Sequence, residues 1–220
     1  MKYSKKMRGY IPLIPPIDKP FVDLSATEVE VYFDWFLSHI DERTSYLCEK
    51  IAKDMNISIT NFDYSVESLK LVWKWFLSVA ELAKTPRIEI LKMKQAFPKM
   101  PNSFINQLIG TNRVELSVFS HFVLRDIGMY LGKVLKQNYP VLQWTVKTTP
   151  KNYISINEPL LVGFVDDNPQ YPKPFYPDLE PVSFVEGCAL NILDGTQHEE
   201  DLYNMCVKWI RWIPKDNKNE

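Results

Sequence analysis

A histidine, an arginine and an aspartate lie close together in the middle of the chain, at His121, Arg125 and Asp126. Residues four apart share one face of a helix, so His121 and Arg125 would point the same way. In a cleft, Arg125 could bind a carboxylate or a phosphate while His121 transfers a proton. These three residues are therefore our candidate catalytic groups for a small hydrolase or transferase.

The competing interpretation is that the three side chains form a buried hydrogen-bonded network or a solvated stripe. We favour it, because one helix would supply all three groups, whereas active sites draw their residues from several elements. The surroundings of His121 distinguish the two interpretations. A Glu, Asp or Ser from a second element within hydrogen-bonding distance of His121, in an open cleft, would favour the enzyme.

Other patterns that could carry chemistry are incomplete. Asp166, Asp167 and Asn168 could coordinate a hard cation, but the Gly and the distant Glu of a calcium loop are missing. The seven glycines are too scattered to form a phosphate-binding loop. An odd number of widely spaced cysteines argues against a disulfide framework and a cysteine-based zinc site; they are Cys48, Cys188 and Cys206. We therefore expect no metal and no cofactor.

The segment from Glu158 to Asp201 is strongly acidic. It holds ten acids and one base, a net charge of −9, so the remainder of a chain whose net charge is −1 carries +8. Two explanations stay open: the segment forms an acidic surface that binds a basic protein, or it packs against the chain's own basic residues around Lys84 to Lys99. A partner surface would use carboxylates for steering and aromatic side chains as anchors. The residues predicted for that role are Asp166, Asp167, Tyr171, Phe175, Tyr176, Asp178 and Glu180.

The composition narrows the classes of protein. Of 220 residues, 45% are hydrophobic, 13% aromatic and 24% charged, which is typical of a folded globular protein and excludes a disordered chain. The near-neutral net charge argues against nucleic acid as a partner. No apolar run approaches the ~18 residues of a membrane-spanning helix, and prolines follow the basic N-terminus where a signal peptide would be apolar. We expect a cytoplasmic protein that does not contact a membrane.

Helical spacing of apolar residues organises the chain between an irregular arm at 1–24 and Pro140. Ser25 with Glu28, and Thr27 with Glu30, both have the capping-box spacing that marks a helix start. Helices are expected over 29–55 (as one helix or as two end to end), 65–80, 87–97 and 113–137. Trp73 and Trp75 are two residues apart on the second of these, so we expect that they do not both face the core. The other one is either an exposed interface anchor or, as we favour, packs against a neighbouring element of the chain.

The central helix carries Gly128 and Gly132 on one face. Glycine inside a helix costs about 1 kcal/mol relative to alanine, so two glycines four residues apart predict that another element approaches closely there. After Pro140 the pattern changes to alternation of apolar and polar residues, which is typical of strands. Strands are expected over 142–146, 153–156, 160–165 and 182–185, followed by a C-terminal helix.

The sequence RDIGMYLGKVLKQNYPVLQWTV, together with the NEPLLVGF that follows it, resembles a unit in bacterial proteins of unknown function. In that unit a helix with a G-x-Y-L-G stretch leads into a strand opened by Trp and then into a further strand. The matching residues here are Gly128, Tyr130, Leu131, Gly132, Trp144 and Pro159. Some of these proteins look like immunity or accessory proteins, and the resemblance implies no catalytic residues.

Together these observations predict an α+β fold in a single domain over 1–220. The arm at 1–24 precedes a helical portion at 25–140, and 141–220 forms a small antiparallel sheet and the C-terminal helix. We expect a non-enzymatic bacterial cytoplasmic binding protein, immunity-like or accessory, that uses the acidic surface at 158–201. The alternative is the small hydrolase or transferase with a polar site around His121, Arg125 and Asp126.

Overall fold

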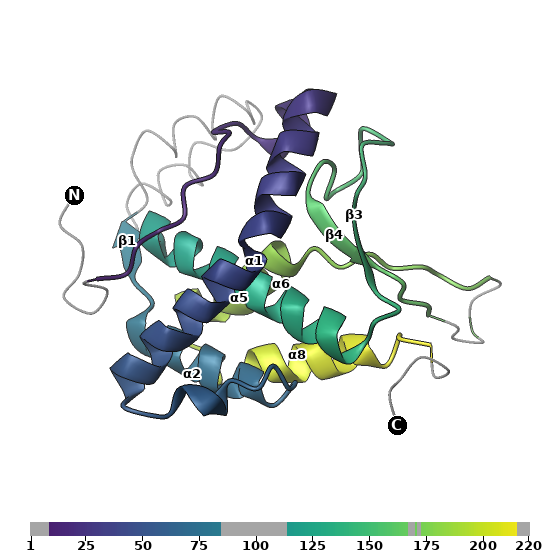
Figure 1. Ribbon diagram of the computed structural model, residues 1–220. Coiled ribbons are helices and arrows are strands. Elements are labelled where there is room, and N and C mark those ends of the chain that lie inside the picture. The colour runs from purple at the N-terminus through teal and green to yellow at the C-terminus, as the bar shows by residue number, and fades with distance from the viewer. Residues whose placement is uncertain (1–8, 85–113, 167–169, 171–172, 215–220) are drawn as a thin grey trace, which may run out of the picture.

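The computed structural model describes residues 9–84, 114–166, 170 and 173–214, and the account below refers to these residues (Figure 1). The α-helices are α1 (Ala26–Met55), α2 (Ser68–Val79), α5 (Val118–Asn138), α6 (Pro181–Ala189), α7 (Asn191–Asp194) and α8 (Asp201–Ile210). The strands are β1 (Leu82–Lys84), β2 (Val114–Leu116), β3 (Gln143–Val146) and β4 (Pro159–Val162), and the 3₁₀ turns are η2 (Phe21–Asp23) and η3 (Ile59–Asn61). A mainly helical portion precedes a small antiparallel sheet and a C-terminal helix, so the predicted α+β class is confirmed.

The first helix, α1, begins at the predicted capping box. The Ser25 hydroxyl accepts a hydrogen bond from the Glu28 amide at 3.4 Å, and the Glu28 carboxylate accepts one from the Ser25 amide at 2.9 Å. The helix then continues without a break to Met55 and ends at Asn56, which adopts the left-handed conformation. Of the two arrangements expected for 29–55, the structure therefore shows one long helix.

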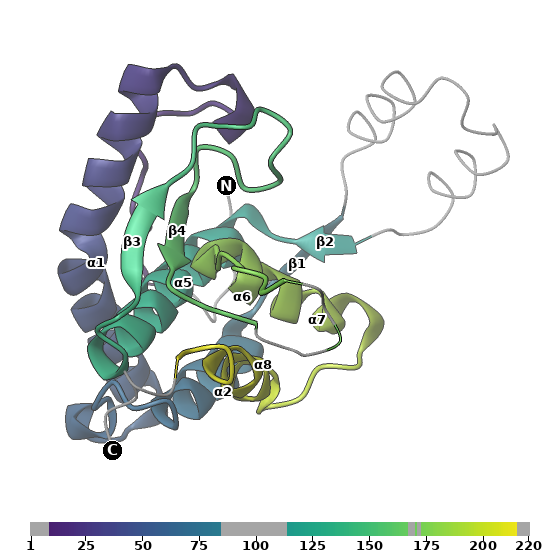
Figure 2. The ribbon, with the colours of Figure 1, turned by 90° about the vertical axis from the view of Figure 1, so that its right-hand side faces the viewer.

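The central helix, α5, packs against both α1 and α6 and lies between them (Figure 2). The Ser117 hydroxyl accepts a hydrogen bond from the Ser120 amide at 3.1 Å, and this cap starts the helix at Val118. The expectation of a helix from residue 113 is therefore wrong at its start. Val114 to Leu116 instead pair with β1 as a short antiparallel strand, which leaves no backbone groups there for a helical turn.

Gly128 and Gly132 mark the close approach that the sequence predicts. A Cβ atom added to Gly128 would lie 2.8 Å from the backbone Cα of Val182 in α6. A Cβ atom added to Gly132 would lie 2.5 Å from the ring of Trp144 in β3. The two glycines thus let α6 and the β3 strand pack directly on the α5 backbone.

The strands expected after Pro140 form only in part. Gln143 pairs with Val162 and Val146 with Pro159 in the antiparallel β3–β4 hairpin. The strand expected over 153–156 is wrong, because the chain turns there, and Ile154 is 93% exposed with no strand to cover it. The strand expected over 182–185 is also wrong: the carboxylate of Glu180 caps a helix there, α6, with Pro181 in its first turn. The helix expected over 87–97 lies outside the described residues.

The main hydrophobic core draws on α1, α2, α5, α6 and α8, and so on both the helical portion and the part after residue 140. Both Trp73 and Trp75 belong to it, because α2 is covered by α8 as well as by α1. Trp73 donates to the backbone carbonyl of His198 at 3.1 Å, and Trp75 donates to the Asp54 carboxylate at 3.0 Å. The expectation that the two would not both face the core is therefore wrong, and neither is an exposed interface anchor. The single-domain organisation stays a prediction.

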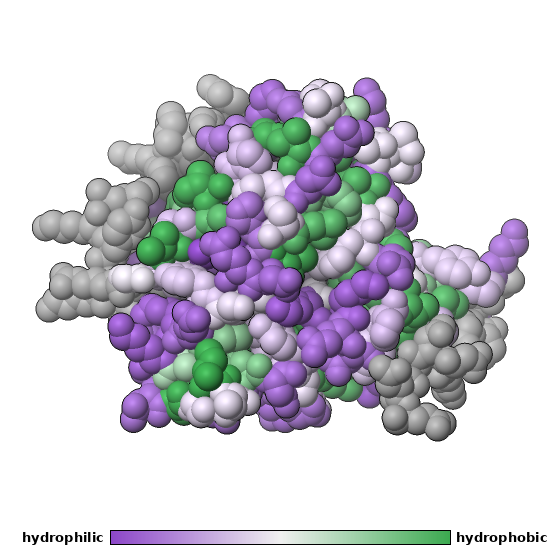
Figure 3. Space-filling view, viewed as in Figure 1, coloured by the Kyte–Doolittle hydropathy of each residue, from purple (hydrophilic) through white to green (hydrophobic). Residues whose placement is uncertain are grey.

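The surface on the side shown in Figure 3 alternates between small hydrophobic and hydrophilic areas. Within the part of the chain that the structure describes, no helix combines the length and the apolar character that a membrane crossing requires.

Candidate functional site

The structure separates Asp126 from the other two candidate catalytic residues. Asp126 is fully buried, and its carboxylate accepts hydrogen bonds from the Tyr10 hydroxyl and from the Arg43 guanidinium, the latter at 2.6 Å. Arg43 also donates to the backbone carbonyl of Ile11 at 2.8 Å. This cluster fastens the described part of the N-terminal arm to α1 and α5. Asp126 does not line the pocket that His121 faces, and its role here is structural.

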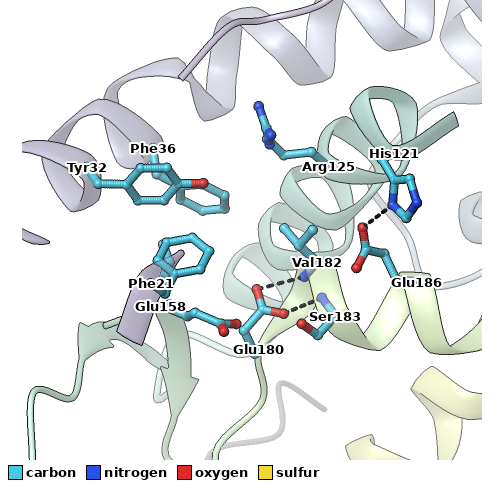
Figure 4. A pocket seen from close by; sticks show the side chains of 11 residues that line it. Phe21, Tyr32, Phe36, His121, Arg125, Glu158, Glu180, Val182, Ser183 and Glu186 are labelled. Carbon is cyan, nitrogen blue, oxygen red and sulfur yellow. Dashed lines mark hydrogen bonds and ion pairs between the residues drawn. The ribbon is translucent and has the colours of Figure 1, made fainter. Parts of the chain in front are cut away.

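His121 and Arg125 line a pocket of about 290 Å³ between α1, α5 and α6 (Figure 4). The arm and the start of β4 also contribute to its wall. We call it the α1–α5–α6 pocket. Its wall includes aromatic side chains from the arm and α1, and carboxylates from the loop before β4 and from α6. Its lining residues are Phe21, Tyr32, Phe36, His121, Arg125, Glu158, Pro159, Glu180, Val182, Ser183 and Glu186.

His121 pairs with a carboxylate from a second element. Its Nδ1 lies 2.7 Å from Oε1 of Glu186 in α6, and both side chains are partly exposed to the pocket (Figure 4). The hydrogen bond with Glu186 raises the pKa of His121 above its ordinary value. The surroundings of His121 thus meet the condition that the sequence set for an enzyme, a Glu from another element in a cleft.

Two further glutamates lie side by side in the pocket. Burial, together with the charges of Glu180 and Glu186, raises the pKa of Glu158 to about 7. Glu180 is buried, and its carboxylate accepts hydrogen bonds from the amides of Val182, at 3.0 Å, and Ser183 at the start of α6. Burial raises the pKa of Glu180 as well. Near neutral pH, Glu158 is therefore present in both its protonated and its ionised form. Perturbed pKa values of this kind are typical of carboxyl groups at functional sites.

Aromatic side chains form the wall that faces these glutamates. The rings of Phe21 and Tyr32 meet edge to face with centroids 4.9 Å apart, and Phe36 lies beside Tyr32 on α1. Asn157 holds Phe21 in place by donating to its backbone carbonyl at 2.7 Å. Burial raises the pKa of Tyr32 to about 12, so its hydroxyl stays protonated. The wall is built from packed elements and does not depend on a loop tip.

Arg125 lies across the pocket from the glutamates. Its guanidinium donates to the backbone carbonyl of Leu13 in the arm at 3.1 Å and lies 5.4 Å from the ring centroid of Phe122 and 5.9 Å from that of Trp35. In Figure 4 its side chain extends from α5 toward α1. These contacts fix Arg125 at the rim between the arm and α1.

The described residues contain no group of three or more His, Cys, Asp or Glu side chains placed to hold a metal ion. The cysteines lie away from the pocket and are buried. Burial raises the pKa of all three thiols, to about 12 for Cys48 and Cys206 and about 11 for Cys188. Because a thiolate is the reactive form of cysteine, these thiols are inert near neutral pH.

The predicted partner-binding residues are divided between interior and surface. Asp178 pairs with Lys147 and accepts a hydrogen bond from the Tyr153 hydroxyl at 2.6 Å, and Glu180 is buried in the pocket, so neither belongs to an exposed acidic face. The backbone of Asp166 pairs with that of Phe175. The side chains of Phe175 and Tyr176 are 60% and 66% exposed. Asp167 and Tyr171 lie outside the described residues.

Other acids of the 158–201 segment also bind bases of the same chain. Glu199 pairs with Lys74 at 2.8 Å and Glu200 with Lys70 at 3.0 Å, which joins the start of α8 to α2. The basic stretch after Lys84 lies outside the described residues. Asp178, Glu199 and Glu200 thus pair with lysines of the same chain, and packing of the segment against the basic residues around Lys84 to Lys99 stays a prediction.

The comparisons give no relatives: no family model, no curated protein and no solved structure matches this chain. The resemblance to bacterial proteins of unknown function therefore stays a prediction. The pocket also contains residues that the sequence did not single out as a site, namely Phe21, Tyr32, Phe36, Glu158 and Glu186. The nearest local signal was the neighbouring pair Glu180 and Pro181, which caps α6, and it identifies a helix start rather than a pocket.

Proposed function

We propose that this protein is a binding protein and that the α1–α5–α6 pocket is its ligand site. One observation carries the proposal: side chains that recognise polar ligands converge on a single cavity from elements far apart in the sequence. His121 comes from α5, Glu158 precedes β4, and Glu180 and Glu186 come from the start and middle of α6. Binding sites are typically such concave, partly apolar cavities with a few convergent polar groups.

A fragment screen on the full chain tests this proposal. Small polar and aromatic fragments are added to isotope-labelled protein, and amide shifts report where each one binds. We expect hits that perturb residues around Val182 and Ser183, and we expect Glu158→Gln and Glu186→Gln to weaken them. The matched control is Glu199→Gln, at an exposed glutamate in the turn before α8 that pairs with Lys74. Hits that are absent, or that respond equally to all three variants, would refute a ligand site here.

A second candidate is an enzyme that uses the same pocket for acid–base catalysis. The observation that favours it is a pair of groups in one cavity with raised pKa values: that of Glu158 is raised to about 7, and that of His121 is raised above its ordinary value by Glu186. Such an enzyme would turn over one of the fragments that bind. Chemical change of a bound fragment over hours, abolished by both Glu158→Gln and His121→Gln, would favour this candidate over simple binding.

We also propose a bacterial cytoplasmic location and, on the exposed loop, a contact with a basic protein as expected of an immunity-like or accessory protein. Three unpaired cysteines support the reducing compartment. The docking contact is supported by Phe175 and Tyr176, which expose large aromatic side chains. Replacing both with serine should weaken capture of a basic partner without changing stability, whereas unchanged capture would exclude this loop.

A further inference from the structure

We propose that the ligand of the α1–α5–α6 pocket carries an ammonium group, and that this group lies between the aromatic wall and the carboxylates of Glu158 and Glu180. The inference rests on the proposed function and names the chemical class of the ligand. It follows from how charge and aromatic surface are distributed within the cavity.

The two ends of the pocket differ in character. Figure 4 shows Phe21, Tyr32 and Glu158 at one end, with Glu180 next to Glu158, and the His121–Glu186 pair at the other end. At the second end the imidazole and the carboxylate balance each other at 2.7 Å. At the first end two carboxylates face aromatic rings.

The basic side chains that line the pocket already have partners within the protein. His121 binds Glu186, and Arg125 is held by the carbonyl of Leu13 and the rings of Phe122 and Trp35. The environment of Glu158 is dominated by burial and by the negative charges of Glu180 and Glu186, which oppose its ionisation. A cation brought by a ligand would relieve this repulsion, whereas an anion would add to it.

Aromatic rings beside carboxylates are suited to an organic cation. Ring faces attract ammonium groups electrostatically, and the attraction grows when water is excluded, while carboxylates accept the N–H bonds of a primary amine. A bare metal ion would instead need several oxygen ligands around it, and the described residues do not provide such a group. The cavity of about 290 Å³ has the volume of roughly ten water molecules at ~30 Å³ each, which admits a small amine.

Binding of an ammonium group should release a proton. The pKa of Glu158 is raised to about 7. The other titratable groups that line the pocket with it are Glu180 and Glu186 from α6, His121 and Arg125 from α5, and Tyr32 from α1. A cation beside Glu158 favours its ionised form, which is populated as the pH rises through the raised pKa of Glu158. Affinity for amines should therefore rise as the pH increases from about 6 to 8.

Calorimetric titration of the full chain tests the inference with matched probes. 2-Phenylethylamine is compared with 2-phenylethanol, and choline with 3,3-dimethylbutanol, so that each cation has a neutral counterpart of similar shape. We expect each amine to bind about tenfold or more tightly than its alcohol. Glu158→Gln should remove most of that preference and the proton release, whereas the control Glu199→Gln should retain both.

The outcomes separate the inference from the function on which it rests. Equal affinity for amine and alcohol, or amine binding that Glu158→Gln leaves unchanged, would overturn the ammonium assignment. Displacement of the amines by millimolar calcium or magnesium chloride would overturn it in favour of an inorganic cation. If neutral or anionic fragments bind in the pocket and amines do not, the assignment fails while the binding function survives. If no fragment of any class binds there, the proposed function fails.

Discussion

Removing the carboxylate of Asp126 should strongly destabilise the fold, because it leaves the buried Arg43 guanidinium without its charged partner. Asp126 and Arg43 have side chains only 1% and 5% exposed. Arg43 Nε lies 3.3 and 3.2 Å from the two Asp126 oxygens, and Nη2 lies 2.6 Å from one of them. In Asp126→Ala the guanidinium loses its carboxylate partner and keeps its bond to the Ile11 carbonyl and its place over the rings of Tyr10 and Tyr46, 5.8 and 4.5 Å from their centroids.

The expected loss follows from leaving a buried charge without its partner, which costs about 3–5 kcal/mol. With a typical urea slope of about 2 kcal/mol per molar, the midpoint of urea unfolding should fall by roughly 2 M. Tryptophan fluorescence reports the transition, because Trp75 is buried beside Tyr10 with ring centroids 6.3 Å apart. A loss of less than about 1 kcal/mol would refute the reasoning.

A variant in which the whole cluster is apolar separates the desolvation of the charge from packing. In the triple variant Tyr10→Phe/Arg43→Met/Asp126→Leu no buried polar side chain of the cluster is left without a partner. Exchange of buried ion pairs for apolar residues of similar volume is often neutral or stabilising, so this variant should recover most of the stability lost in Asp126→Ala. A triple variant as unstable as the single one would show that shape, not charge, holds the arm.

Three further predictions concern other sites. Gly128→Ala should destabilise the fold by about 1–2 kcal/mol in urea unfolding, because the added methyl meets the Val182 backbone. The control Gly187→Ala in α6 should stabilise the fold by up to about 1 kcal/mol, because its added methyl meets no atom within 4 Å. Glu158 has a pKa raised to about 7, so wild-type stability should fall relative to Glu158→Gln as the pH rises from about 4.5 to 7; parallel profiles would contradict this. In NMR titrations, Glu186→Gln should lower the pKa of His121, and the stability from this pair should be lost as the pH rises through that pKa.

Local rules were sufficient where the structure depends on neighbours in the sequence. One of the two predicted capping boxes, that of Ser25 and Glu28, starts α1, and the alternation around Trp144 located β3. Gly128 and Gly132 indicated a close approach because glycine in a helix is costly without one. The sequence did not say which element approaches, since that depends on how α6 and β3 fold back.

Local rules failed where a partner decides the outcome. The alternating residues around Ile154 have no neighbouring strand, so they form a turn, and the apolar run after Pro181 follows a capping carboxylate, so it forms a helix. Trp73 and Trp75 are both buried because α8 covers a second side of α2. In each case the pattern was real, but its interpretation required a contact between residues distant in the sequence.

The acidic segment shows the same limit and suggests where function lies. Its acids are divided among ion pairs with α2, the Asp178–Lys147 pair, the cap of α6 and the pocket. The ion pairs with α2, the Asp178–Lys147 pair and the cap of α6 stabilise the fold or are neutral to it, because each gives the carboxylate a partner. Glu158 is different: burial and two like charges oppose its ionisation more than its interaction with Ser183 favours it, so a neutral amide in its place would avoid that cost. A group retained against the stability of the fold is expected at a functional site, so Glu158 is the residue on which the binding hypothesis should first be tested.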